Sequence, residues 1–202
     1  MLDFDVGEDP DNRVELVALA AACHEPDPAV RRVAVEARLD IDRFLEFMAL
    51  ERICGHWDGY SLNRNNYRLW FPAQGRGIVL PHGMDQLLGD SEAGLFDHAL
   101  PLVAAAVMQD DNWRERYHRK LAELIPVVRP IDRWLAAVDA RCEELQDVLT
   151  EVDADAAAAH RDRVAELKER LVQRADALAR LVAAGPPEPV AVTGAAGAEP
   201  GD

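Results

Sequence analysis

Residues 40–71 read DIDRFLEFMALERICGHWDGYSLNRNNYRLWF, and the spacing of apolar residues in this stretch decides the fold class. The first half repeats apolar side chains every three or four positions, which is typical of an amphipathic helix. Asp40 stands just before that repeat and has a side chain suited to an N-cap. We therefore predict a helix over residues 41–54, and the pattern changes after it.

The change is to two short β-prone runs, residues 67–71 and 78–80. Between them lies Pro-Ala-Gln-Gly-Arg-Gly, which has the proline and glycines of a hairpin turn. The sequence therefore predicts a two-stranded ribbon over about residues 66–81.

Helical periodicity covers most of the rest of the chain. The predicted helices are residues 13–23, 29–39, 100–108, 111–125, 130–149 and 156–183. Asp111 is expected to cap the helix that it begins, and Pro126 to end that helix. The fold class predicted is mainly α with a small β-hairpin, an α+β arrangement.

The length of 202 residues suits one compact domain with an extension. We expect residues 1–183 to form this unit and residues 150–183 to be a long amphipathic helix within it. Residues 184–202 are rich in Pro, Gly and Ala and offer little to bury, so they are expected to be a disordered tail.

The formal net charge of −15 disfavours binding to nucleic-acid phosphates, which needs a basic face. Metal ions and Lys- or Arg-rich proteins suit such a surface better. No apolar run reaches the roughly 18 residues of a membrane span, and the acidic first residues are unlike a signal peptide. The three cysteines form no CxxC pair, so no zinc site is indicated.

The loop after the predicted helix has the spacing of a kinase catalytic loop, H-R-D-x-x-x-x-N. His56, Asp58 and Asn63 stand at its His, Asp and Asn positions. In such a loop the Asp accepts or orients the proton of the substrate hydroxyl, and the Asn oxygen binds Mg²⁺. Asp58 is therefore the candidate base and Asn63 a candidate metal ligand.

A second aspartate follows the ribbon. Because a hairpin doubles back, Asn63 before the first strand and Asp85 after the second return to the same end, where both could bind one ion. The alternative for Asp85 is a turn or a helix N-cap. Asn65 and Asn66 fit turns at a strand entry, or one of them orients Asp58 by a hydrogen bond.

The string from Asp40 to Asp85 resembles the CotH kinase family, the spore-coat-type atypical protein kinases. In that family a helix beginning D-x-D-x-F-L leads to G-[HN]-W-D-x-Y-x-x-N-x-N-N-Y, then to a hairpin and P-x-x-x-D. Nearly all of this pattern is present. The departure is His82-Gly83-Met84, where many members have a Trp-containing run.

The resemblance implies a protein-kinase-like C-terminal lobe followed by helices. It also implies phosphorylation of protein serine residues with ATP and Mg²⁺ or Mn²⁺, and it associates the chain with the spore surface or the cell envelope. By position, Asp58 is the catalytic residue, and Asn63 and Asp85 are the metal ligands. The supporting loop residues are His56, Asn65 and Asn66.

A phosphate-binding lysine is missing from its usual place. The only lysines, Lys120 and Lys168, follow Asp85, whereas a kinase has this lysine before its catalytic loop. We expect a kinase lobe truncated of its nucleotide-clamping part, with this chain alone inactive.

Two alternatives stay open. One is a pseudokinase or scaffold that binds basic protein partners. The other is a metal-dependent hydrolase built from His56, Asp58, His82 and Asp85.

Overall fold

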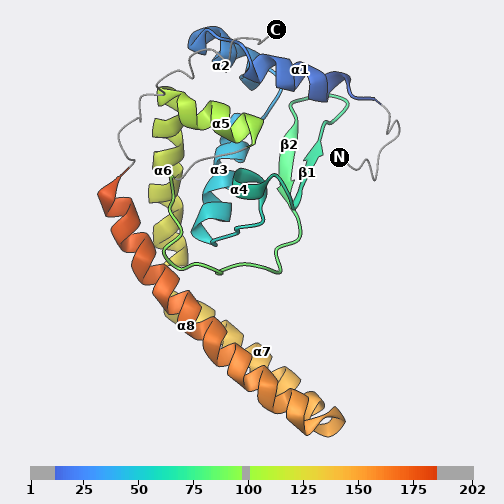
Figure 1. Ribbon diagram of the computed structural model, residues 1–202, viewed down its shortest axis with the longest axis vertical. Helices are drawn as coiled ribbons and strands as arrows, with labels where there is room; N and C mark the ends of the chain where they lie inside the picture. The colour runs from blue at the N-terminus through green and yellow to red at the C-terminus, as the bar shows by residue number, and fades with distance from the viewer. Residues whose placement is uncertain (1–11, 97–100, 186–202) are drawn as a thin grey trace, which may run out of the picture.

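The structure is a computed structural model that describes residues 12–96 and 101–185, and helices dominate it (Figure 1). The elements in chain order are α1 (Val14–Cys23), α2 (Pro28–Glu36), α3 (Ile41–Ile53), α4 (Tyr60–Asn63), β1 (Tyr67–Trp70), β2 (Ile78–Pro81), α5 (Leu102–Gln109), α6 (Asp111–Val128), α7 (Ile131–Val152) and α8 (Ala154–Ala184). The predicted fold class, mainly α with a small β-hairpin, is confirmed. No helix in the two described ranges combines the length and apolar character needed to cross a bilayer.

The central element of the body is α3, which is buried on several sides. Nine of its thirteen residues are buried, among them Glu51 and Arg52. It packs against α6 and β2, so a single stripe of apolar residues would not suffice. Asp40 is its N-cap, as predicted, and accepts a hydrogen bond from the Arg43 amide at 3.4 Å.

The ribbon is tied to the start of α3 through its turn. β1 and β2 pair antiparallel, with Tyr67 opposite Pro81 and Trp70 opposite Ile78. In the turn, the Gly77 amide donates to the Arg38 carbonyl at 2.7 Å, and the Gly77 carbonyl accepts from the Asp40 amide at 2.9 Å. These bonds hold α3, which precedes the candidate loop, to the ribbon that follows it.

Helix α6 differs from the prediction at both ends. It does not stop at Pro126 but continues to Val128, because a proline in the last turn removes only one helical hydrogen bond and the Arg129 amide closes that turn on the Ile125 carbonyl. Its N-cap is Asp110 rather than Asp111. The Asp110 carboxylate accepts from the Trp113 amide at 3.1 Å.

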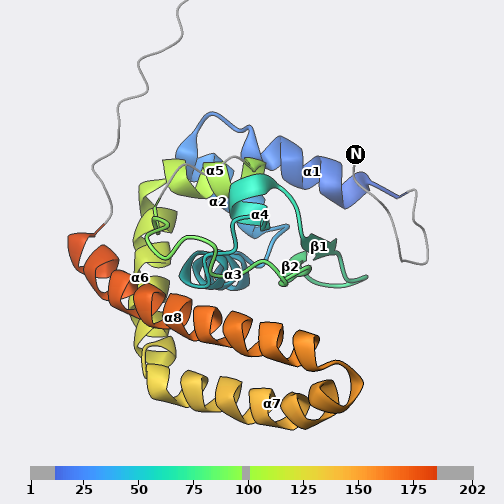
Figure 2. The same ribbon diagram turned by 60° about the horizontal axis from the view of Figure 1, so that its bottom comes forward.

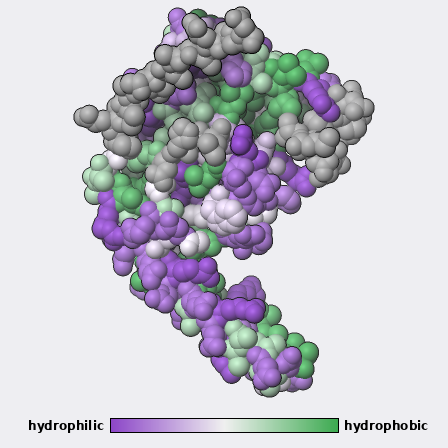
Figure 3. Space-filling view, in the orientation of Figure 1, coloured by the Kyte–Doolittle hydropathy of each residue, from purple (hydrophilic) through white to green (hydrophobic). Residues whose placement is uncertain are grey.

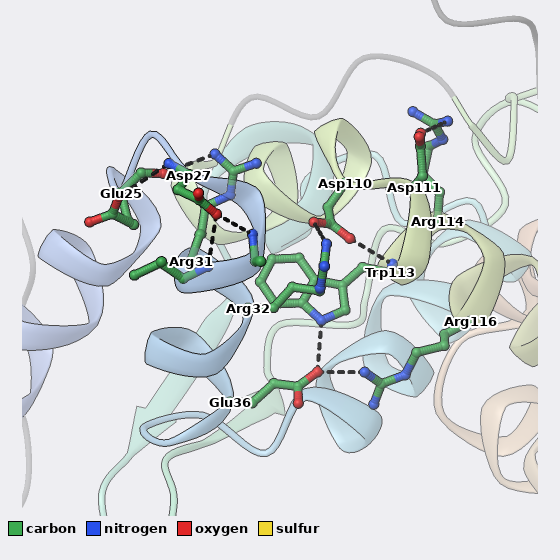
Figure 4. Close-up of polar contacts among 12 residues, drawn as sticks. Glu25, Asp27, Arg31, Arg32, Glu36, Asp110, Asp111, Trp113, Arg114 and Arg116 are labelled. Atoms are coloured by element: carbon green, nitrogen blue, oxygen red, sulfur yellow. Dashed lines mark hydrogen bonds and ion pairs between the residues drawn. The ribbon is translucent and has the colours of Figure 1, made fainter.

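Polar contacts join α2 to α6 (Figure 4), and one further contact reaches α3. Arg32 pairs with the Asp110 carboxylate at 2.7 Å, and the indole N–H of Trp113 donates to Glu36 at 2.9 Å. Arg116 bonds both Glu36 and Asp42, at 2.5 and 2.7 Å. The hydrogen bond from Arg116 lowers the pKa of the Asp42 carboxyl.

Helices α7 and α8 form an arm that projects from the body (Figures 1 and 2). α7 has no buried residue, and the surface of the arm is mainly hydrophilic with apolar groups at its far end (Figure 3). The last part of α8 returns to the body and buries Arg174, Ala177 and Leu178.

The predicted boundary of the last long helix was wrong at its start. Residues 150–152 belong to α7, and Asp153 caps α8 by accepting from the amides of Asp155 and Ala156. The expected tail from residue 186 onward lies outside the described residues.

Candidate active site

The buried carboxylate of Glu51 fixes the start of α4. Its two oxygens accept hydrogen bonds from the backbone N–H groups of Tyr60 and Ser61, at 2.7 and 2.9 Å. The first N–H groups of a helix have no carbonyl partner within that helix. Glu51, on the neighbouring helix α3, supplies the acceptors and so caps α4. Burial raises the pKa of the Glu51 carboxyl, and these hydrogen bonds offset part of the rise.

The contact leaves no room for a side chain at position 59. A Cβ on Gly59 would lie 2.4 Å from Glu51 Oε1 and 2.7 Å from His56 Nδ1. The glycine between Asp58 and Tyr60 is therefore required by packing. The sequence offered a weak signal for Glu51, a charged residue within an otherwise apolar helix, and we did not predict its role.

His56 is fully buried beside Glu51. Its Nδ1 lies 3.7 Å from Glu51 Oε1, and its amide donates to the Glu51 carbonyl at 2.9 Å. Neither ring nitrogen has a hydrogen-bond partner among the described residues. His56 thus lies inside the loop and does not reach the surface where a ligand would bind.

Aromatic packing holds α4 against α3 and the ribbon. The buried ring of Tyr60 contacts Phe44, Phe47 and Tyr67, with centroids 5.8, 6.4 and 4.5 Å away. Burial raises the pKa of the Tyr60 hydroxyl above its ordinary value. α4 is consequently fixed at both its backbone and its side chains.

Three side-chain amides surround the Asp58 carboxylate. Asn63 donates to Oδ1 at 2.5 Å, while Asn65 and Asn66 donate to Oδ2 at 3.1 and 2.8 Å. Asn66 also donates to the main-chain carbonyl of Asp58 at 3.1 Å. Within the described part of the chain, three neutral amides of the loop therefore fix the orientation of Asp58, and no cation pairs with it.

These hydrogen bonds leave part of the carboxylate free. A carboxylate has about four acceptor positions, two on each oxygen. Among the residues that the structure describes, both Oδ2 positions of Asp58 are used and one Oδ1 position remains. That position can accept a hydrogen bond from a hydroxyl group.

The register of the ribbon brings the flanking residues to one end. Because Tyr67 is opposite Pro81, Asn63 and Asp85 each stand four residues outside the same strand pair. The His82 amide continues the pairing by donating to the Asn66 carbonyl at 3.1 Å. Asp85 itself lies in an exposed turn, and no helix begins there.

Gly83 connects this end of the ribbon to the Asp58 loop. It has a φ of +55°, and a Cβ there would lie 2.3 Å from Asn66 Oδ1. Asn66 has a φ of 50°. Two residues in the left-handed region are therefore packed against each other, which brings the segment leading to Asp85 beside the residue that holds Asp58.

The donor chemistry fits a hard cation. Asn63 must turn its nitrogen to the Asp58 carboxylate, which only accepts, so its Oδ1 is directed elsewhere and can bind an ion. With Asp85 it offers oxygen ligands, the kind Mg²⁺ and Mn²⁺ prefer, and Mg²⁺ takes few ligands from protein and the rest from phosphate and water. Within the described ranges no three His, Cys, Asp or Glu side chains gather to hold a metal. This does not support the hydrolase alternative.

The span between Asp58 and Asp85 carries its positive charge on arginines, of which Arg76 lies in the ribbon turn, away from the loop, and pairs with Asp40 at 3.7 Å. Residues 59–84 contain no Asp or Glu and three arginines, Arg64, Arg68 and Arg76. The lysines are engaged in helices, where Lys120 bonds Glu123 and Lys168 bonds Asp139. In a chain of net charge −15, the span between Asp58 and Asp85 is locally basic.

The family model described as CotH kinase protein matches residues 5–178. No curated protein matches the chain. The matched span includes the Asp58 loop, the ribbon, Asp85 and most of α8. The chain therefore belongs to the CotH kinase family, and its function is kinase-like.

Proposed function

We propose that this chain is the catalytic and metal-binding lobe of a kinase that transfers the γ-phosphoryl group of ATP to serine hydroxyls of a protein. The observation that carries the proposal is the Asp58 carboxylate, held by three amides and left with one acceptor position. A serine hydroxyl bonded to that position would be oriented for attack, and Asp58 would receive its proton.

Asn63 and Asp85 are proposed to bind a divalent cation, Mg²⁺ or Mn²⁺. When bound, such an ion would neutralise the negative charge that develops on the phosphoryl group during transfer. Asn63 would contribute Oδ1, since its nitrogen is engaged by Asp58. His56, Asn65 and Asn66 would support the loop and touch neither ion nor nucleotide.

Arg64 is proposed to attract the phosphates, whereas Arg76 lies in the ribbon turn at the other end of the hairpin and pairs with Asp40 at 3.7 Å. Arg64 directly follows Asn63 at the end of α4 and is exposed. A guanidinium can bind a phosphate with two parallel hydrogen bonds. Such a contact would supply positive charge where a kinase ordinarily uses a lysine.

The test compares the wild type with Asp58→Asn and Asp162→Asn, the latter an exposed aspartate on α8. Mn²⁺ binding in the presence of ATP is measured on this chain, and transfer from labelled ATP to a serine-containing protein is measured on a longer form that includes the nucleotide-clamping part. Asp58→Asn should lose transfer by at least about a hundredfold, since general base catalysis contributes on the order of 10²–10⁴. Undiminished transfer by Asp58→Asn would refute the catalytic assignment.

A scaffold that binds basic protein segments is the second candidate. The observation favouring it is α7, which has six Asp or Glu residues against two arginines and no buried residue. Binding of an arginine-rich peptide, together with no binding of Mn²⁺ and ATP, would favour the scaffold. Metal-dependent ATP binding would favour the kinase.

A further inference from the structure

We propose that Arg174 of α8 is a positioning residue that holds the two segments leading to and from the candidate site at a fixed separation. This inference rests on the proposed function of Asp58 and Asp85. Arg174 lies 116 residues after Asp58 and was not among the predicted site residues.

The side chain of Arg174 donates to four main-chain carbonyls. Its Nε bonds the Ile53 oxygen at 3.0 Å, and one Nη bonds the Arg52 oxygen at 2.5 Å. The other Nη bonds the oxygens of Ser91 and Ala93, each at 2.7 Å. Arg174 is only 2 % exposed, so water does not compete for these acceptors.

The acceptors belong to the two segments that carry the proposed catalytic and metal-binding residues. Ile53 ends α3 and stands five residues before Asp58, and Ser91 stands six residues after Asp85. Between these points the segments run alongside each other, because the Leu88 amide donates to the Cys54 carbonyl at 3.0 Å. Arg174 therefore joins the backbone just upstream of one proposed site residue to the backbone just downstream of the other.

The electrostatics suit a guanidinium at this place. Arg52 and Ile53 are the last residues of α3, and their carbonyls belong to the negative end of that helix. A planar guanidinium has five N–H donors in a fixed fork, whereas an ammonium has three. A lysine could keep the charge but could not reach both pairs of carbonyls in the same geometry.

The position on α8 explains how the contact is made. Arg174 lies one helical turn before Ala177 and Leu178, the buried residues by which α8 packs on the body. Nearby, Arg180 bonds Glu92 at 2.6 Å but is exposed. Arg180 approaches the same segment from solvent and provides a matched control.

The experiment compares the full chain with Arg174→Lys and Arg180→Lys. Three quantities are measured for each: unfolding in urea, backbone hydrogen exchange, and Mn²⁺ affinity with ATP present. We expect Arg174→Lys to fold, to exchange at least tenfold faster at residues 54–60 and 88–93 with α6 unchanged, and to bind Mn²⁺ at least tenfold more weakly. Arg180→Lys should change each by less than twofold.

The outcomes separate this inference from the proposed function. If the wild type does not bind Mn²⁺, the proposed function fails, and faster exchange confined to the two segments still supports the positioning role. Uniformly faster exchange, or unchanged exchange and Mn²⁺ affinity, would overturn it. If Arg174→Lys does not fold, Arg174→Gln is measured in the same way, and failure of both variants to fold would also overturn it in favour of a purely structural role.

Discussion

Asn66 donates from its amide nitrogen to two acceptors of Asp58, the carboxylate Oδ2 at 2.8 Å and the main-chain carbonyl at 3.1 Å. One residue thereby fixes both the backbone and the side-chain direction of the candidate base. Asn66 has a φ of 50°, a conformation that Asn tolerates better than most residues.

Replacing Asn66 by Ala should weaken the loop more than replacing Asn65. Asn66→Ala removes two partly buried hydrogen bonds and should lower the free energy of unfolding by about 1–3 kcal/mol. Asn65→Ala removes one exposed hydrogen bond of 3.1 Å and should cost about 1 kcal/mol or less. Urea unfolding of both variants measures the difference, and equal costs would contradict the unequal roles inferred here.

Gly59→Ala should destabilise the protein because the new methyl group would collide with buried atoms. The nearest, Glu51 Oε1, would be 2.4 Å away, and relief of such overpacking costs about 1–3 kcal/mol. The control is Gly89→Ala, where the nearest atom is Trp57 Cδ1 at 3.4 Å and little change is expected. Thermal unfolding of the two variants provides the comparison, and a stable Gly59→Ala protein would show that Glu51 does not occupy this position.

Asp110→Ala should cost more stability than Asp111→Ala. The Asp110 side chain caps α6 and pairs with Arg32, and loss of an N-cap alone costs about 1 kcal/mol. The Asp111 side chain is 89 % exposed and, among the described residues, bonds only Arg114 on its own helix, so its removal should cost about 0.5 kcal/mol or less. The urea unfolding midpoints of the two variants measure this difference. A larger loss of stability in Asp111→Ala than in Asp110→Ala would show that Asp111 is the cap.

The effect of Glu51 on stability should depend on pH. Burial raises its folded-state pKa above the ordinary value of 4.5, so the folded protein keeps this proton to a higher pH than the unfolded chain does. The free energy of unfolding of the wild type, relative to Glu51→Gln, should therefore fall as pH rises from 4.5 to the raised folded-state pKa and then level off.

Urea unfolding of both proteins between pH 4 and pH 8 tests this. Taking the difference between them cancels the other titrating groups that the two proteins share. A difference that rises with pH would mean that the two amide hydrogen bonds outweigh the cost of burying the charge.

Local patterns predicted the fold well where one residue determines one feature. The helical repeat after Asp40 and the turn residues between the β-prone runs gave α3 and the ribbon within a residue or so. Prediction failed at both ends of α6. Asp110 and Asp111 are both possible N-caps and Pro126 is a possible end, and contacts with neighbouring helices decide where the helix begins and ends. The ion pair with Arg32 of α2 holds Asp110 in the N-cap position. The packing of α6 outweighs the one hydrogen bond lost at Pro126.

The candidate site could be predicted only in part. The spacing of Asp58 and Asn63 and the return of the ribbon to Asp85 are visible in one stretch of sequence. Glu51 and Arg174 were not predicted, because their partners are main-chain groups, which have no signature in the sequence. Arg174 also lies in a helix of alternating acids and bases, where nothing local distinguishes it from its exposed neighbours.

The unbroken course of α8 has a structural consequence. From Ala154 at the far end of the arm to Arg174 the helix runs twenty residues, about 30 Å at 1.5 Å per residue. No break interrupts α8 over this length, and near its other end Arg174 bonds the backbone beside the candidate site. The far end of the arm and the Arg174 contacts beside the candidate site therefore belong to one continuous helix.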